Sequence, residues 1–261
     1  MGVDVEHRRL VSRPEPLPEG GLASLAPPLL SAFFLDVDGT LLEIRPLPGD
    51  VVADAPLRAL LARLADAAAS AVALVSGRRI DDLDRIFSPM ALPAAGLHGA
   101  EIRFGDGVRT HADDGAMAAA RAPLRGFVEL HSGLMLEDKG ATLALHYRQR
   151  PDLAGAALDA AQGVAEAFGL AVQRGKMVAE LKQASHSKAT AIEALLARPP
   201  FAGRRPVFVG DDLTDEIGFA CVNARDGVSV RIGTAEASTA RFQLGDPAAL
   251  RAELAALLRQ G

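Results

Sequence analysis

Two aspartates stand two positions apart after a short apolar run in the stretch SAFFLDVDGTLLEI. At ~3.3 Å per residue and with alternating side chains, Asp36 and Asp38 should project from the same side of a strand's carboxyl end. A carboxylate can attack phosphorus without first losing a proton, and it then carries the phosphoryl group as an aspartyl phosphate. Two neighbouring carboxylates become tolerable when a divalent cation joins them, and oxygen ligands favour Mg²⁺. The pair favours such chemistry over a helix cap, and a calcium loop would need further acids where Leu41 and Leu42 follow.

Two other short stretches offer groups that could bind an anion. In AVALVSGRR, Ser76 and Gly77 stand where an apolar run passes into a helical pattern. A hydroxyl and backbone N–H groups at a helix N-terminus can bind an anion, although an ordinary serine N-cap is the simpler alternative. In SHSKATAI, Lys188 precedes another helical pattern and could neutralise a phosphate, although a solvated surface lysine is the default interpretation.

Three acids gather in PVFVGDDLTDEIGF, just past another apolar run. One acid in a first helical turn is a normal partner of the helix dipole, but Asp211, Asp212 and Asp215 are harder to explain in that way. If this strand lies beside the strand before Asp36, Asp211 can complete the shell of the cation. Asp212 or Asp215 would then support the ligands from outside that shell.

The elements that must position these groups alternate between strands and helices. Short apolar runs and helical patterns alternate between Ala32 and Arg103, and the alternation resumes after Lys188. This predicts an α/β core with a mostly parallel sheet covered on both faces. Ligands bind at the carboxyl ends of the strands in such sheets, so the motifs should converge there.

The middle of the chain has a different pattern. Hairpin signals occur at Asp106–Gly107, Lys139–Gly140 and Arg174–Gly175, with an alanine-rich helix before the last of them. Hairpins with helices predict an antiparallel sheet that has its helices on one side. The predicted domains are a poorly ordered arm over residues 1–30, a core over 31–103 and 183–261, and an inserted α+β domain over 104–182.

Composition narrows the classes of partner. A net charge of −5 argues against nucleic acid as the main partner, and the chain has no membrane-length apolar run. Cys221 is the single cysteine, which excludes an internal disulfide and fits a reducing cytoplasm. The Pro- and Gly-rich first thirty residues lack the features of a signal peptide.

Together these residues resemble the four motifs of the haloacid dehalogenase (HAD) superfamily of phosphohydrolases. The resemblance implies a Rossmann-like core with an inserted cap of the C2 type, in which Asp36 is the nucleophile and Asp38 the general acid/base. The implied phosphate-binding residues are Ser76, Gly77 and Lys188. The implied Mg²⁺ ligands are Asp36, Asp38 and Asp211, with Asp212 and Asp215 in the same acidic motif.

More narrowly, the chain resembles the trehalose-6-phosphate phosphatase family from about Ala32 to Leu258. The stretches that carry the resemblance are LDVDGTL, SGR, GLHGAE, EDKGATLALHYR, ELK ahead of SK, and GDDLTDE. It implies that a set of cap residues binds the sugar: Glu137, Lys139, Arg148, Lys176 and Glu180. The alternation also places Leu143, Leu145 and Tyr147 on one strand face opposite His146 and Arg148, and Met177, Ala179 and Leu181 opposite Lys176, Glu180 and Lys182.

The alternative for these cap residues is the solvated face of a two-layer domain. His146 is interpreted as structural, and Glu101 is a weaker candidate near the junction of core and cap. The chain departs from the family where Gln183, Ser185 and Ala189 replace a usual Pro and two Gly, which bears on the stiffness of the linker from cap to core.

The resemblance implies a Mg²⁺-dependent phosphatase that acts on a small phosphorylated disaccharide, trehalose 6-phosphate, through an aspartyl phosphate. The alternatives are another sugar phosphatase or a phosphosugar mutase on the same scaffold, such as a sucrose-phosphate phosphatase or a phosphomannomutase, and a non-catalytic sugar-phosphate sensor. The sequence predicts neither a nucleic-acid nor a membrane partner, and it leaves the oligomeric state open.

Overall fold

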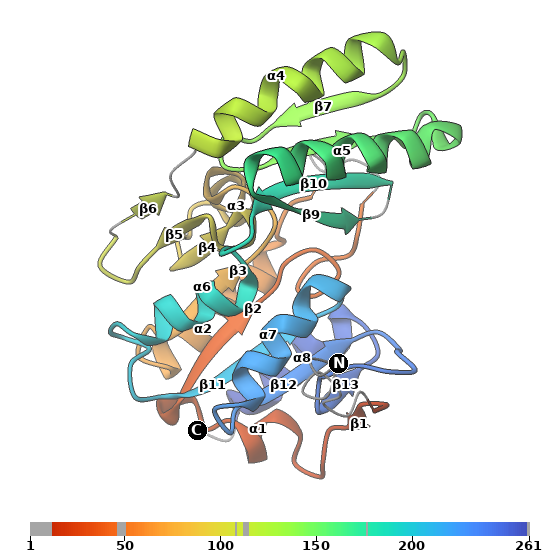
Figure 1. Ribbon diagram of the computed structural model, residues 1–261. Coiled ribbons are helices and arrows are strands. Elements are labelled where there is room, and N and C mark those ends of the chain that lie inside the picture. The colour runs from red at the N-terminus through yellow and green to blue at the C-terminus, as the bar shows by residue number, and fades with distance from the viewer. Residues whose placement is uncertain (1–11, 46–50, 108, 112–114, 176, 260–261) are drawn as a thin grey trace, which may run out of the picture. The chain divides into compact units, whose positions relative to one another are not determined.

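The computed structural model describes residues 12–45, 51–107, 109–111, 115–175 and 177–259, and it divides into two compact units (Figure 1). Unit 1 comprises Met1–Arg109 and Ser187–Gly261, and unit 2 comprises Thr110–His186. In the described part of the chain, no helix combines the length and the apolar character needed to cross a membrane.

Unit 1 is built on a sheet with the strand order β1-β13-β12-β11-β2-β3-β4-β5-β6. The strands from β1 to β4 pair in parallel, and β5 pairs antiparallel with β4. Their bounds are β1 Glu15–Pro16, β2 Ser31–Leu35, β3 Val72–Val75, β4 Ala94–Gly96, β5 Glu101–Arg103, β6 Arg109–His111, β11 Arg205–Gly210, β12 Val228–Ile232 and β13 Phe242–Leu244. The mostly parallel sheet confirms the prediction from the alternating pattern.

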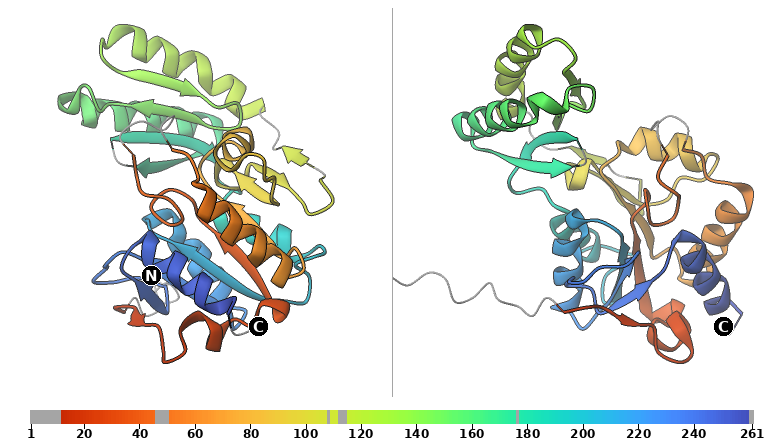
Figure 2. Two further views of the ribbon diagram at one scale, coloured as in Figure 1. Left: turned by 180° about the vertical axis from the view of Figure 1, so that it is seen from behind. Right: turned by 90° about the vertical axis from the view of Figure 1, so that its right-hand side faces the viewer.

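Helices cover both faces of this sheet, which explains why the central strands are apolar without interruption. Figure 2 shows α2 and α8 on one side of the sheet, in orange and dark blue, and α6 and α7 on the other. Every residue of β2 is buried as a result. The helix bounds are α1 Gly21–Leu25, α2 Ala55–Ala67, α3 Ile80–Phe87, α6 Lys188–Leu196, α7 Glu216–Asn223 and α8 Pro247–Leu257, with 3₁₀ turns η1 Pro28–Leu30, η3 Leu97–Gly99 and η5 Leu213–Asp215.

The strand order places a topological switch point at β2. From β2 the chain continues through β3 and β4 on one side, while the returning β11 pairs with β2 on the other, with Leu35 opposite Val209. Open α/β sheets bind ligands at the carboxyl ends of the strands beside such a switch point. The segments after β2, β3 and β11, which carry Asp36, Ser76 and Asp211, therefore start from the same edge of the sheet.

Unit 2 is a four-stranded antiparallel sheet in the order β7-β8-β10-β9, with two helices packed on one face. The strands are β7 Met135–Asp138, β8 Leu143–His146, β9 Leu170–Gly175 and β10 Val178–Gln183, and the helices are α4 Gly115–Leu130 and α5 Ala154–Phe168, preceded by the turn η4 Pro151–Leu153. Leu143, Leu145, Tyr147, Ala179 and Leu181 belong to the apolar cluster beneath the helices. This confirms the predicted antiparallel sheet with helices on one side and the apolar side of both alternations.

The prediction that residues 1–30 form a poorly ordered arm is wrong for residues 12–30. There β1 pairs with β13, and α1 packs on α8 with Leu22 and Ala26 fully buried. The Leu22 N–H also donates to Glu253 Oε2 at 3.0 Å. These contacts join residues more than two hundred positions apart, so local composition carries no sign of them.

Two further differences concern the inserted part of the chain. The hairpin around Asp106–Gly107 belongs to the large sheet of unit 1, because β5 pairs with β4. The predicted insert 104–182 begins and ends a few residues before unit 2, which is Thr110–His186. Helix α4 was not predicted. It contains Pro123 and Gly126, both unfavourable inside a helix, and it is stabilised by packing of Met117, Ala120 and Leu124 in the core of unit 2.

Candidate active site

Asp36 and Lys188 meet at the carboxyl edge of the unit 1 sheet. Asp36 is the first residue after β2, and its N–H donates to the carbonyl of Val209 at 2.9 Å, which continues the pairing with β11. Lys188 is the first residue of α6, where Ser187 caps the helix by accepting from the Thr190 N–H. The Lys188 ammonium donates to Asp36 Oδ1 at 2.8 Å, and both side chains are buried. The structure thus brings together two predicted residues that are 152 positions apart in the sequence.

The acidic motif after β11 completes this cluster. Lys188 Nζ also donates to Asp215 Oδ1 at 2.5 Å. Asp215 in turn accepts the backbone N–H groups of Asp211 at 2.9 Å and Asp212 at 3.0 Å through Oδ2, which fixes the turn that follows β11. The Asp212 carboxylate accepts from the N–H and hydroxyl of Thr214 at 2.7 and 2.6 Å, and so caps η5.

A group of three carboxylates at this point can hold a cation. Ligand oxygens of Asp36, Asp211 and Asp215 all lie within 4.8 Å of one another. The Thr40 hydroxyl, fully buried, lies 3.3 Å from both Asp36 Oδ2 and Asp211 Oδ1. The Gly39 backbone packs closely on the Asp211 carboxylate, because a Cβ at Gly39 would lie 2.1 Å from Asp211 Oδ2. Hard oxygen ligands with an excess of negative charge suit Mg²⁺.

The electrostatics of the cluster reflect this excess of carboxylates. Burial, and then the charges of Asp215 and Asp211, raise the pKa of Asp36 well above its usual value, against the opposing effect of Lys188. Burial and the neighbouring Asp215 and Asp212 raise the pKa of Asp211 to about 6. Burial also raises the pKa of Asp215. A divalent cation would relieve these effects, since it favours the ionised form of each ligand.

The pKa values of Lys188 and Asp212 are both shifted so that the charged form is favoured. Burial alone would lower the pKa of Lys188, but the carboxylates of Asp36 and Asp215 outweigh it and raise that pKa. Burial alone would raise the pKa of Asp212, but Lys188 and the hydrogen bonds from Thr214 lower it. Lys188 is therefore firmly cationic between the carboxylates that contact it.

Asp38 lies apart from the three carboxylates. Both of its oxygens accept from Arg78, at 2.6 Å from Nε and 2.7 Å from Nη2, in a two-pronged ion pair. The pairing with Asp38 raises the pKa of Arg78. The third carboxylate within reach of Asp36 and Asp211 is thus Asp215 in this structure, whereas the side chain of the predicted ligand Asp38 is paired with Arg78.

The segment after β3 carries the predicted anion-binding groups. The Ser76 N–H continues the strand by donating to Ala95, and Ser76 Oγ accepts from the Arg78 N–H at 3.2 Å. Ser76 is buried, and Gly77 follows it at the sheet edge. Glu101, the weaker candidate, instead accepts the Ile80 N–H at 2.9 Å and so holds the start of α3.

On unit 2, Glu137 and Glu180 lie on the sheet face opposite the helices. Glu137 and Glu180 are both in register with Ala144, so each carboxylate lies on a strand flanking β8. The Glu180 Oε1 accepts from the buried hydroxyl of Thr142 at 2.7 Å and from Lys139 Nζ at 3.3 Å. The Glu137 carboxylate accepts from His146 Nε2 at 2.9 Å, and this hydrogen bond lowers the pKa of Glu137.

The structure says less about the two remaining residues predicted to bind the sugar, Arg148 and Lys176. Arg148 is exposed and lies two residues beyond the end of β8, so strand alternation does not fix its face. Lys176 lies outside the described residues.

Of the side chains that support the predicted residues, only His146 was singled out from the sequence, as structural. Arg78 stands in the SGR stretch and Thr40 in DVDGT, so both were quoted without a role. Thr142 and His146 hold the carboxylates of unit 2, and only the pairing of β8 with its neighbours shows this. For Arg78, Thr40 and Thr142, the signal in the sequence was nearness to predicted site residues.

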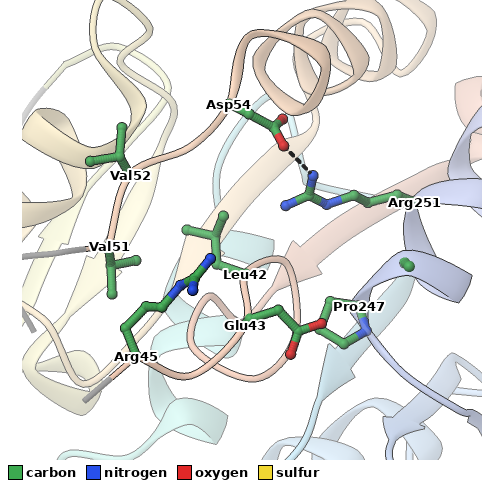
Figure 3. A pocket seen from close by; sticks show the side chains of 9 residues that line it. Leu42, Glu43, Arg45, Val51, Val52, Asp54, Pro247 and Arg251 are labelled. Atoms are coloured by element: carbon green, nitrogen blue, oxygen red, sulfur yellow. Dashed lines mark hydrogen bonds and ion pairs between the residues drawn. The ribbon is translucent and has the colours of Figure 1, made fainter. Parts of the chain in front are cut away.

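A cavity of about 360 Å³ lies in unit 1 beside the segment that follows β2 (Figure 3). It is lined by Leu42, Glu43, Arg45, Val51, Val52, Asp54, Pro247, Ala248 and Arg251. Arg251 Nη1 donates to Asp54 Oδ2 at 2.7 Å and joins α8 to the start of α2. None of the three clustered carboxylates lines this cavity, so it is separate from the candidate active site.

Comparison with known proteins identifies relatives of the whole arrangement. Trehalose-6-phosphate phosphatase of Escherichia coli (strain K12) is 44% identical over 206 residues, which are 78% of this chain and 77% of that one. The C-terminal domain of C. albicans trehalose-6-phosphate phosphatase has a TM-score of 0.78 at 19% identity, covering 95% of this chain and 99% of the other. A Bacteroides thetaiotaomicron phosphatase of the haloalkanoate (HAD) superfamily shares the fold at a TM-score of 0.61 and 18% identity, with 98% of each chain covered.

The match to a family model shows which family the chain belongs to. The model of the trehalose-phosphatase family matches residues 34–248, a span that begins in β2 and contains the whole carboxylate cluster and all of unit 2. With the HAD fold and the relative described above, the chain is a phosphatase, and it belongs to the trehalose-phosphatase family.

Proposed function

We propose that this enzyme hydrolyses trehalose 6-phosphate to trehalose and inorganic phosphate, with Mg²⁺, through an aspartyl phosphate on Asp36. The observation that carries the proposal is the buried group of Asp36, Asp211 and Asp215 with Lys188 between two of its members, in a chain of this family. A cytoplasmic location stays a prediction from the single cysteine.

In the first step, a carboxylate oxygen of Asp36 attacks phosphorus in line as the bond from phosphorus to the sugar oxygen breaks. Asp38 protonates the departing oxygen, so that the sugar leaves as an alcohol. Ser76, the Gly77 N–H and Lys188 bind the phosphoryl oxygens and balance their charge. In the second step, Asp38 takes a proton from water, which attacks phosphorus and releases inorganic phosphate and free Asp36.

The residues present fit a divalent cation. The carboxylates of Asp36 and Asp211 would hold it. The Asp215 carboxylate fixes the turn that carries Asp211 by accepting the backbone N–H of Asp211. When bound, Mg²⁺ stabilises negative charge on the transferring phosphoryl group. Asp38 as a further ligand, and Asp212 as a support for the others, stay predictions.

For the sugar, we propose that the polar face of the unit 2 sheet supplies the binding groups. Glu137, Lys139, Glu180 and Arg148 offer acceptors and donors for hydroxyls, and their binding energy serves to orient the substrate rather than to alter bonds. The fixed positions of the Glu137 and Glu180 carboxylates support this proposal, because preorganised groups lose less freedom on binding.

The test is a phosphate-release assay on a panel of phosphorylated sugars, with Mg²⁺ and with EDTA. Trehalose 6-phosphate should be preferred over glucose 6-phosphate and sucrose 6-phosphate, and activity should require the metal. Asp36→Asn, which cannot form the acyl phosphate, should bind substrate and release no phosphate. Residual turnover within about tenfold of wild type, a barrier change of ~1.4 kcal/mol, would refute the assignment of the nucleophile.

The same panel separates the alternatives. Equal rates on the three sugar phosphates would indicate a general sugar phosphatase. Conversion of a hexose phosphate to its isomer without phosphate release would indicate a mutase. Binding without turnover would indicate a sensor.

A further inference from the structure

The segment Gly96–Glu101, GLHGAE, has a backbone that ordinary residues seldom adopt. Leu97 has φ 48° and His98 has φ 55°, both in the left-handed region, and Gly99 has φ 101°. Leu97 is fully buried and His98 is 8% exposed. Left-handed backbone is uncommon for non-glycine residues and is strained for a bulky one, so surrounding contacts must hold it, and such sites gather near functional groups. The proposed function gives this segment no part.

Two backbone hydrogen bonds tie the segment to the loop that carries the predicted phosphate-binding groups. The His98 N–H donates to the Ser76 carbonyl at 3.1 Å, and the Leu97 N–H donates to the Arg78 carbonyl at 2.9 Å. They fix the loop on both sides of Gly77. In a trans peptide the C=O and the following N–H point in opposite directions. Because the Ser76 carbonyl is fixed against His98, the Gly77 N–H is directed away from this segment.

The imidazole of His98 limits the same loop from the side. A Cβ at Gly77 would lie 2.7 Å from His98 Nε2 and 2.8 Å from Cε1, closer than van der Waals contact allows. The ring therefore packs directly on the Gly77 backbone. Together with the two hydrogen bonds, the His98 ring restricts the position of the Ser76–Gly77 loop.

The other half of the segment contacts the helix that begins with Lys188. A Cβ at Gly99 would lie 2.8 Å from the carbonyl oxygen of Ser187, the residue before Lys188. The Glu101 carboxylate holds the Ile80 N–H at the start of α3. One buried segment thus contacts the serine loop, the start of α6 and the start of α3.

We propose that His98, with the left-handed turn it occupies, is a positioning residue that holds the Ser76–Gly77 loop for the transferring phosphoryl group. The proposal rests on the proposed role of that loop, and it assigns His98 no contact with substrate. Since the phosphoryl group is common to every phosphate ester, the effect should be the same for substrates with and without a sugar. This distinguishes His98 from the sugar-binding residues of unit 2.

The test compares His98→Asn, which keeps tolerance of the left-handed backbone, with His98→Gly, which removes both the ring and the strain. Asp226→Gly is the matched control. Asp226 also has a left-handed φ, 52°, but stands in the turn before β12, at the opposite end of the sheet. For each folded variant, kcat/KM is measured on trehalose 6-phosphate and on p-nitrophenyl phosphate, together with inhibition by inorganic phosphate and the melting temperature.

Both His98 variants should lose about 10²-fold in kcat/KM, by the same factor on the two substrates, because a small misplacement of a binding group costs that much. Inorganic phosphate should inhibit them more weakly, and Asp226→Gly should match wild type. Unchanged kcat/KM and phosphate inhibition in folded His98 variants would overturn the proposal, whether or not the melting temperature falls. A loss confined to trehalose 6-phosphate would also overturn it.

A second pair of variants covers the case in which the single His98 variants fold poorly. Gly77→Ala alone should be inactive, because its methyl group meets the ring, whereas Gly77→Ala with His98→Gly should recover part of the activity. No recovery would overturn the packing argument. If wild type hydrolyses p-nitrophenyl phosphate but not trehalose 6-phosphate, the proposed substrate fails, while the measurements on the smaller ester still decide the role of His98.

Discussion

Replacing Asp211 with Asn should raise the stability of the metal-free protein. Burial and the neighbouring carboxylates raise the pKa of Asp211 from an ordinary 3.8 to about 6. Each pKa unit is worth ~1.4 kcal/mol, so the ionised carboxylate costs the metal-free fold on the order of 3 kcal/mol at neutral pH. Asn removes that charge and keeps nearly the same shape. In EDTA, Asp211→Asn should therefore unfold at a temperature equal to or above that of wild type.

Mg²⁺ should offset this difference in stability. A cation at about 100 times its dissociation constant stabilises the folded state by ~2.7 kcal/mol. For a chain of this size each kcal/mol is worth roughly 2–4 °C, so wild type should gain about 5–10 °C. Asp211→Asn lacks one carboxylate of the group that holds the cation, and most of the gain should be lost.

Thermal unfolding followed by circular dichroism, with EDTA and with MgCl₂, measures both effects. Because the folded pKa of Asp211 is raised, its destabilising effect is present above about pH 6 and disappears as the pH falls toward 4. The advantage of Asp211→Asn in EDTA should shrink in the same range. Asp159→Asn, on the exposed face of α5, is the control and should follow wild type throughout. An equal Mg²⁺ shift in wild type and Asp211→Asn would refute the reasoning, as would a wild type that does not respond to Mg²⁺.

The remaining predictions concern unit 2 and the N-terminal segment. Lys139→Ala or Glu180→Ala should lower kcat/KM for trehalose 6-phosphate by about 10²-fold, because one or two charged hydrogen bonds are worth ~3 kcal/mol. The kcat/KM for p-nitrophenyl phosphate should be nearly unchanged, and equal losses on both substrates would point to a damaged fold. Thr142→Val removes the neutral donor to Glu180 and should cost about tenfold on the sugar substrate alone, with Thr142→Ser close to wild type. A Thr142→Val loss that persists in a Glu180→Ala background would contradict action through that carboxylate. Leu22→Ala should cost about 2–5 kcal/mol and lower the melting temperature by roughly 4–20 °C in calorimetry, whereas a change within a degree or two would mean that the N-terminal segment does not pack on α8.

The gathering of Asp36, Ser76 and Asp211 at one edge of the sheet could be predicted because these residues sit at strand ends. Asp36, Ser76 and Asp211 each follow an apolar run by one or two positions, and the prediction needed only that these runs become neighbouring parallel strands. The pairing of β2 with both β3 and β11 satisfies that condition. Local pattern and topology therefore agree at this edge of the sheet.

The N-terminal segment and α4 show where local pattern fails. Glycines and prolines made residues 12–30 read as disordered, yet the short β1 and α1 are held by β13 and α8 from the far end of the chain. Pro123 is unfavourable inside a helix, yet α4 is stabilised by the apolar core of unit 2. In both cases tertiary contacts outweigh weak local propensity.

The two aspartates of DVDGT show why the supporting residues decide what a motif can do. Two carboxylates that lie side by side without a cation repel each other. Here Asp36 is paired with Lys188, which comes from the start of α6, and Asp38 is paired with Arg78, which comes from the loop after β3. Each acid has its own cation, so the two occupy different environments although they are two residues apart. Distinct environments allow neighbouring acids to take distinct roles, as the proposed mechanism requires of Asp36 and Asp38, and the cations that create these environments come from elsewhere in the sequence.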